Sequence, residues 1–169
     1  MTAQTKLNIF IENAYEEYQI DEAAVYADTV KIARFIFSDA EIINKSCLKG
    51  YKYKSVSFDI VFVNNSEIQR INCEYRDKDA AADVITFAMF ADSAESGRFI
   101  IDGDINLGEI IISLDKIKAQ SEENKVSFKE ELYFIIPHGI LHLLGFDHQN
   151  QHDYDYMVLQ QKRAEAEVL

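Results

Sequence analysis

Proline is nearly absent from this chain of 169 residues: it occurs once, at position 137, and glycine occurs only six times. So few turn-forming residues leave little room for long flexible linkers. A chain of this length most simply forms one domain, and we expect that domain to span residues 1–169. No apolar run approaches the ~18–20 residues that a membrane helix needs, which argues against a membrane partner.

Cysteine is also rare. Cys47 and Cys73 stand in no metal-ligand spacing, and two isolated cysteines favour reduced thiols over a disulfide framework. The first ten residues, MTAQTKLNIF, lack the basic start and the continuous apolar run of a signal peptide. These features together predict a cytoplasmic protein.

Basic residues are in deficit, since 17 Lys and Arg against 29 Asp and Glu give a net charge of −12. Because Lys and Arg drive binding to phosphate, such a chain should be repelled by nucleic acid overall. Residues 45–78 differ: they hold seven basic and four acidic side chains, a surplus of three, so the remainder carries −15. A local basic surface and a merely solvated excess of charge both remain open.

What the chain does contain is a series of apolar segments with strand or helix periodicity. Four segments read as strands: 6–13, 55–65, 83–90 and 108–114. Five read as helices: 21–37, 66–76, 115–123, 127–144 and 153–167. Residues 91–104 read as a loop. Asp21 and Ser127 are the expected N-caps of two helices, and Glu130 completes a capping box with Ser127. The pattern predicts an α/β (α+β) fold, a small mixed β-sheet packed with helices.

All four histidines lie within residues 138–152, three of them in the stretch PHGILHLLGFDH. His138 and His142 are four residues apart, so on a helix they project from one face. Gly145 is suited to ending that helix and reversing the chain, which brings His148 back to the same point. Three neutral imidazoles with an open fourth position are typical of catalytic zinc. We therefore predict one Zn²⁺ per chain at the end of a long helix. One such histidine alone would more often be an ordinary core residue.

Gly139 stands where zinc peptidases of the metzincin type carry a glutamate, in the pattern H-E-x-x-H-x-x-G-x-x-H. That glutamate is their general base, and glycine has no side chain to replace it. A hydrolase of this other class would need a carboxylate from elsewhere, with Glu109 and Glu131 as candidates.

The stretch HGILHLLGFDH resembles the H-G-x-L-H-L-x-G-[YF]-D-H pattern of the YbeY family of metal-dependent endoribonucleases. INCEYRDKDAAADVITF (71–87) is similar to that family's N-x-x-[YF]-R-x-K-D-x-x-T-D-V-L-S-F segment. LGEIIISLDKIKAQSEE (107–123) is similar to its L-G-D-I-V-I-S strand and following helix. The resemblance covers about residues 60–160, in the same order along the chain.

The resemblance implies a single metal-dependent hydrolase domain that cleaves single-stranded RNA. Its implied role is rRNA maturation, at the 3′ end of 16S rRNA, and ribosome quality control, with the small subunit and its proteins as partners. By position, the implied zinc ligands are His138, His142 and His148, and the functional arginine is Arg76. A guanidinium suits the charge that develops on phosphoryl oxygens during cleavage. Read without the resemblance, Arg76 is a surface residue pairing with a neighbouring aspartate.

The chain departs from the family at three positions. Pro137 precedes the first ligand, and because proline lacks the N–H that would bond the Tyr133 carbonyl, it should bend the helix or loosen the site. Ala82 replaces a threonine, and Ala88 stands where proline is common, so the local loop shape is expected to differ.

The remaining candidates each have two interpretations. Asp147 either orients a ligand imidazole or caps the turn. His152 is a proton carrier or, as we favour, a surface residue. Three lysines are candidates for contacts with the RNA backbone, and two aromatic residues are interpreted as core rather than as base-stacking platforms: Lys52, Lys54 and Lys78; Tyr75 and Phe146. An alternative function is a ribosome-assembly factor that cuts nothing and whose metal is structural, closed by a fourth protein ligand from Asp147 or His152.

Overall fold

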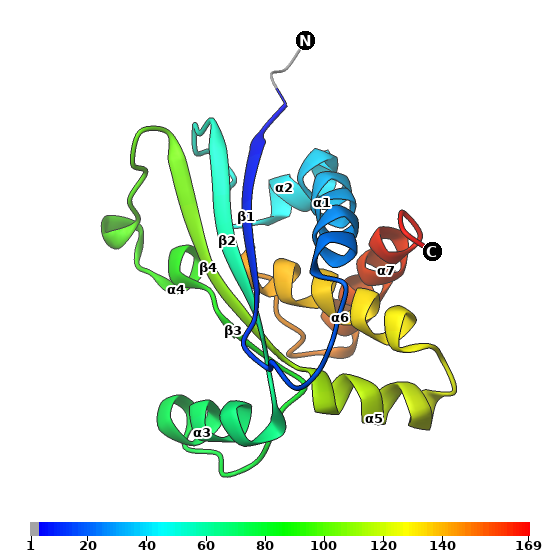
Figure 1. Ribbon diagram of the computed structural model, residues 1–169. Helices are drawn as coiled ribbons and strands as arrows, with labels where there is room; N and C mark the ends of the chain where they lie inside the picture. The colour runs from blue at the N-terminus through cyan, green and yellow to red at the C-terminus, as the bar shows by residue number, and fades with distance from the viewer. Residues whose placement is uncertain (1–3) are drawn as a thin grey trace.

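The computed structural model describes residues 4–169, and its centre is one four-stranded sheet with helices on both faces (Figure 1). The strands are β1 (Lys6–Asn13), β2 (Ser55–Val63), β3 (Val84–Phe87) and β4 (Asp104–Ser113). The α-helices are α1 (Glu22–Ser38), α2 (Ala40–Lys45), α3 (Asn65–Arg76), α4 (Met89–Asp92), α5 (Leu114–Asn124), α6 (Phe128–Leu143) and α7 (Gln151–Glu165). A 3₁₀ turn, η1, spans Glu95–Gly97. The α+β fold with a small mixed sheet is as predicted.

The strand order in the sheet is β1-β2-β4-β3. β1, β2 and β4 run parallel, whereas β3 is antiparallel to β4 and forms one edge of the sheet. Gly108 makes this close pairing of β3 with β4 possible: its φ is +121°, and a Cβ there would lie 1.8 Å from the Phe87 carbonyl oxygen. A side chain at position 108 would therefore force the edge strand away.

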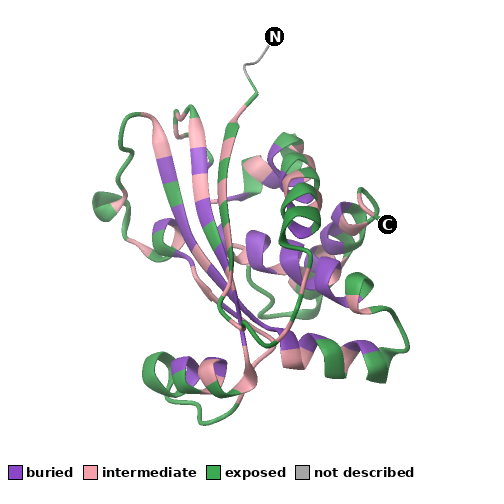
Figure 2. Ribbon diagram, in the orientation of Figure 1, coloured by how far each residue is buried: buried purple, intermediate pink, exposed green. Residues whose placement is uncertain are grey.

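The two faces of the sheet bury different clusters. Ile110 and Ile112 of β4 belong to the main core, which is shared with α1 and α6. Ile111, one residue over, belongs to a smaller cluster with Ile68 and Ile71 of α3. This alternation follows from the two-residue period of a strand. Figure 2 shows α6 almost entirely buried where it crosses the sheet, while the outer strand β1 alternates between exposed and half-buried residues.

α6 begins and ends as the sequence indicates. Ser127 Oγ accepts the Glu130 amide at 3.1 Å, and the Glu130 carboxylate accepts the Ser127 amide at 2.7 Å, so the predicted capping box is confirmed. The helix then runs unbroken through Pro137 to Leu143. The Asp21 cap of α1 is confirmed as well, because its side chain accepts the Ala24 amide.

The clearest differences from the predictions are the bounds of two strands and one additional helix. The strand expected over 83–90 ends at Phe87, and residues 89–92 form the short helix α4. β4 starts at Asp104 rather than 108, because Asp102 and Gly103 adopt positive φ and turn the chain into the sheet early. α2 was not anticipated. Asp39 caps it by accepting the amides of Glu41 and Ile42 directly after α1 ends.

No helix within residues 4–169 combines the length and the apolar character required to cross a bilayer.

Candidate metal centre

α6 delivers two histidines to one face at its C-terminal end. His138 and His142 are one turn apart, and both are half-buried. Pro137 was expected to kink the helix or loosen the site. α6 nevertheless remains one element across it, and the two imidazole Nε2 atoms lie 3.0 Å apart.

The turn after α6 returns the third histidine. The Gly145 amide donates a hydrogen bond to the His142 carbonyl at 2.9 Å, and the Phe146 amide donates one to the Leu141 carbonyl at 3.0 Å. These two bonds form a Schellman motif, and Gly145 takes the left-handed conformation with φ +90° that the motif requires. The reversed chain then carries His148 back over the end of the helix.

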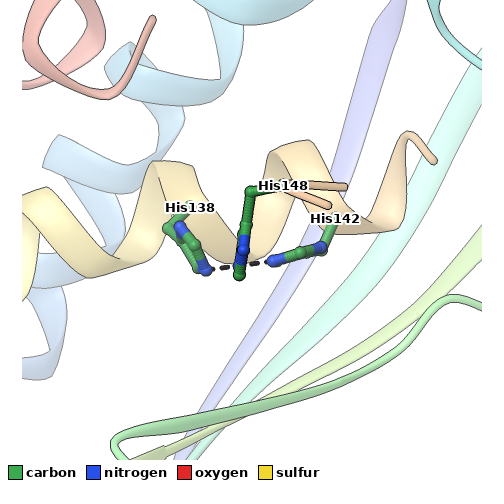
Figure 3. Close-up of side chains that lie close together, drawn as sticks. All are labelled: His138, His142 and His148. Carbon is green, nitrogen blue, oxygen red and sulfur yellow. Dashed lines mark hydrogen bonds between the residues drawn. The ribbon is translucent and has the colours of Figure 1, made fainter. Parts of the chain in front are cut away.

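The three rings converge on one point, as Figure 3 shows. One ligand atom from each of His138, His142 and His148 lies within 4.8 Å of the other two. Nitrogens around a tetrahedral zinc ion at 2.0–2.1 Å stand about 3.3 Å apart, close to the 3.0 Å between the first two rings. The donor set and its spacing therefore fit a divalent metal such as zinc.

The environment of His138 and His142 favours the neutral imidazole, the form that binds metal. Burial lowers the pKa of His138. Burial, reinforced by the neighbouring rings of His138 and His148, lowers the pKa of His142 to about 4. A cation would therefore meet the lone pairs of these two rings without first displacing protons at neutral pH.

Gly139 has a structural reason that the sequence did not reveal. A Cβ at this position would lie 2.7 Å from Cγ2 and 3.0 Å from Cδ1 of Ile110 on β4. α6 therefore packs directly against the sheet at the level of the ligands. The space that a glutamate would need is filled by the core.

The histidines open onto a hollow of about 490 Å³ between the end of α6 and the edge strand β3. Arg76, the last residue of α3, lines this hollow and donates from Nη2 to the Thr86 carbonyl at 2.9 Å. Asp77, in the left-handed conformation, ends α3 directly after it. Arg76 is exposed, and within residues 4–169 its side chain makes this one hydrogen bond, so its other N–H groups can meet a phosphate.

Three aspartates also line the hollow: Asp83, Asp92 and Asp147. Asp147 accepts the His148 amide and the Gln149 side chain, so the structure favours the interpretation that it caps the turn. The hydrogen bond from the Gln149 side chain, and to a lesser extent the one from the His148 amide, lowers the pKa of Asp147. Asp83 accepts the Val84 amide and Gln120. The sequence suggested neither Asp83 nor Asp92 as part of the site.

Other candidates lie outside the hollow. The side chain of His152 is 92% exposed and faces Asp153, in agreement with a surface role. Glu109 lines a separate hollow over α3. Glu131, in the first turn of α6, accepts a hydrogen bond from the side chain of Asn124. Neither glutamate is placed to act as a peptidase base.

The RNA-contact lysines and the aromatic residues have mixed outcomes. The histidine hollow has none of the three candidate lysines among its described lining residues: Lys52, Lys54 and Lys78. The interpretation of Tyr75 as a core residue is wrong: it is 62% exposed, because it lines the open hollow between α3 and the sheet, where its ring meets Phe87 edge-on. Phe146 does pack against the main core.

A fourth protein ligand is not evident. In residues 4–169, the group of side chains that can share one ion has three members, and all are histidines. A closed structural site would need Asp147 or His152, and both point to other partners. The arrangement leaves a coordination position for water or substrate.

Comparisons with known proteins point to one family. A protein-family model described as Endoribonuclease YbeY matches residues 10–168. The Endoribonuclease YbeY of Fusobacterium nucleatum is 36% identical over 161 residues, which cover 95% of this chain and 85% of that protein. The Bacillus licheniformis protein of the same name is 48% identical over 105 residues, 61% of this chain and 66% of that one. The solution structure of TM1509 from Thermotoga maritima shares the fold, with a TM-score of 0.61 at 22% identity over 95% of this chain and 88% of that one.

Proposed function

Because the chain belongs to the YbeY family of endoribonucleases, we propose that it cleaves single-stranded RNA at the three-histidine centre, in the maturation of ribosomal RNA. The observation that carries the proposal is the convergence of three imidazoles and Arg76 on one hollow. The proposed substrate is the 3′ end of 16S rRNA. The proposed setting is the cytoplasm, on the small ribosomal subunit, and the proposed catalytic domain is residues 1–169.

The metal is proposed to be one zinc ion per chain, held by His138, His142 and His148. When bound, such an ion polarises a phosphoryl oxygen and lowers the pKa of coordinated water. The half-buried imidazoles of α6 would hold the metal without adding a carboxylate charge to its ligand set. The ion would therefore keep its own positive charge for a phosphodiester, although three aspartates also line the hollow.

Arg76 has the proposed catalytic role of binding the scissile phosphate. Its bond to the Thr86 carbonyl anchors one end of the guanidinium at the edge strand, beside the histidines. The remaining donors form a fixed fork that fits two phosphoryl oxygens. Charge that builds on these oxygens in the transition state is then stabilised by a group that needs no reorganisation.

Two other functions fit less well. A structural metal in an assembly factor calls for a fourth protein ligand, and the described residues offer only three. A peptidase calls for a carboxylate base beside the metal, but Gly139 packs against Ile110 and both candidate glutamates lie elsewhere.

The test separates metal binding from phosphate binding. His142→Ala should lose both zinc and RNA cleavage, whereas Arg76→Ala should keep zinc and lose about 10²–10³-fold in kcat, as for removal of one preorganised donor. Zinc content is measured on the purified full chain, and cleavage on a labelled single-stranded RNA. His152→Ala and Arg34→Ala, both at exposed positions outside the hollow, are the matched controls. Full cleavage by His142→Ala or by chelated protein would refute the proposal.

A further inference from the structure

Gln161 of α7 is a buried amide that reaches the first ligand from a different helix. It is 2% exposed, and its Oε1 lies 3.2 Å from Nδ1 of His138. Its Nε2 donates to the Phe134 carbonyl of α6 at 3.1 Å. Both ends of the amide are therefore engaged, and both partners belong to the helix that carries His138.

These two contacts determine which way the amide points. A backbone carbonyl can only accept a hydrogen bond, so the NH₂ group must face Phe134. The amide oxygen then faces His138, and because that oxygen also can only accept, Nδ1 of His138 must carry a hydrogen. In a neutral imidazole the other nitrogen, Nε2, is left with its lone pair. That Nε2 is the atom 3.0 Å from Nε2 of His142, on the metal side of the ring.

We propose that Gln161 is a positioning residue that fixes the tautomer and the ring orientation of His138, and so prepares its Nε2 for the metal. Outer partners of this kind hold a ligand imidazole in the binding geometry, and their loss typically weakens metal binding 10–100-fold. An amide does so without bringing a negative charge near the ion. The inference depends on the metal centre of the proposed function, but not on RNA being the substrate.

The contacts of Gln161 explain why a distant helix matters to the site. α7 packs along α6, and its residue Met157, one turn before Gln161, is buried in the main core. The amide is therefore held on a rigid element, a more exact support than a loop side chain gives.

The test compares two buried glutamines. Gln161→Leu should lose the His138 contact, shift His138 to a mixture of tautomers, and weaken zinc binding 10–100-fold. Gln160→Leu is the matched control: Gln160 is equally buried, at 2% exposed, but its side chain accepts a hydrogen bond from Arg163 and makes none to a histidine within residues 4–169. Tautomers are read from long-range ¹H–¹⁵N spectra of the metal-free full chain at about pH 8, above the ordinary histidine pKa of ~6.5. Affinity is read by competition for zinc alone.

Gln161→Glu distinguishes positioning from a mere structural tie. A carboxylate still accepts from Nδ1 of His138 but cannot donate to the Phe134 carbonyl. If Gln161 acts through the imidazole, this variant retains the Nδ1–H tautomer and binds zinc within a few-fold of wild type. The inference is overturned if the wild-type ring carries its hydrogen on Nε2, if Gln161→Leu binds zinc as tightly as wild type, or if Gln161→Glu behaves like Gln161→Leu. None of these readouts uses RNA cleavage, so failure of the proposed activity would leave the result interpretable.

Discussion

At Gly139 a single hydrogen decides how closely α6 approaches the sheet. The ideal Cβ position lies 2.7–3.2 Å from three carbon atoms of the Ile110 side chain, closer than packed atoms tolerate. The neighbours on this side are core residues at full packing density, so they can yield little. The absence of a glutamate in the metal-binding stretch is thus a packing requirement as well as a chemical difference.

Gly139→Ala should therefore destabilise the protein, even though alanine favours a helix by about 1 kcal/mol. Overpacking of a core contact costs about 1–3 kcal/mol, so after the helix gain is subtracted we expect a net loss of up to about 2 kcal/mol in the free energy of unfolding. Urea denaturation measures it. Adding Ile110→Ala should make the alanine at 139 less costly, because the colliding atoms are removed, and strict additivity of the two changes would contradict this explanation.

The residues that could be predicted from the sequence are those whose meaning lies in local spacing. His138, His142 and Gly145 follow from helix geometry, and their convergence with His148 was expected. Gln161 could not be found in this way, because it reaches the site through the packing of α7 on α6. Tyr75 was misjudged for the same reason: nothing local shows that the space between α3 and the edge of the sheet stays open around its ring.

Among the helices, α6 depends on α1 as well as on the sheet. Tyr133 of α6, 2% exposed, donates its hydroxyl to Asp28 of α1 at 2.8 Å. Burial alone would raise the pKa of Asp28, but the hydrogen bonds from Tyr133 and Lys31 outweigh it and lower the pKa. The ionised form of Asp28 is therefore more stable in the folded chain than in the unfolded chain.

Tyr133→Phe should cost about 1–3 kcal/mol at neutral pH, the range for a hydrogen bond to a charged group. Because folding lowers the pKa of Asp28, its contribution is complete above the ordinary carboxyl pKa of about 4 and is lost as the pH falls through the folded-state value. The gap between wild type and variant should thus be constant near pH 7 and shrink below about pH 4. Urea denaturation across this range measures it, and a gap that widens in acid would refute the assignment.

Element boundaries were predictable where local chemistry sets them, as at Asp21 and Ser127. They were missed where tertiary contact decides. Residues 84–90 are apolar except for Thr86, and the sequence offers no reason for the strand to stop at Phe87. In the structure the absence of a side chain at Gly108 allows that end of β3 to lie against β4, and Phe90 of α4 is then buried in the core.

For the molecule as a whole, a charge of −12 must be reconciled with an RNA substrate. Within residues 45–78, Arg70 already pairs with both Glu67 and Glu74, so it is less available to a phosphate. Among the described residues that line the histidine hollow, Arg76 is the one basic side chain besides the histidines. RNA binding by this chain alone should therefore involve few phosphate contacts.

The salt dependence of cleavage should accordingly be shallow. Each phosphate contact to a single strand contributes about −0.7 to the slope of log affinity against log salt, so one or two contacts give a slope between about −0.7 and −1.4. The measurement is kcat/KM of the zinc-loaded chain at rising salt. A slope steeper than about −4 would show that a larger basic surface is in use.

Removing the metal should leave the fold in place. The main core joins the sheet to α1, α6 and α7 without any contribution from the ligands. Chelated protein should keep its far-UV circular dichroism, while saturating zinc, at about 100 times its dissociation constant, adds at most about 2.7 kcal/mol, the value for a ligand that does not bind the unfolded chain. That corresponds to a rise in Tm of at most about 5–10 °C for a chain of this size. A loss of cooperative unfolding in the chelated protein would refute it.

The ligands His138, His142 and His148 lie within a stretch of eleven consecutive residues, and this short spacing affects how zinc binds the denatured chain. Such a short stretch can wrap an ion even when the rest of the chain is random coil. Zinc then partitions between native and denatured molecules, so thermal shifts will understate how tightly the native protein holds it. A synthetic peptide of residues 137–149 would give the missing reference affinity, and the difference from the intact protein would measure how much the surrounding architecture adds.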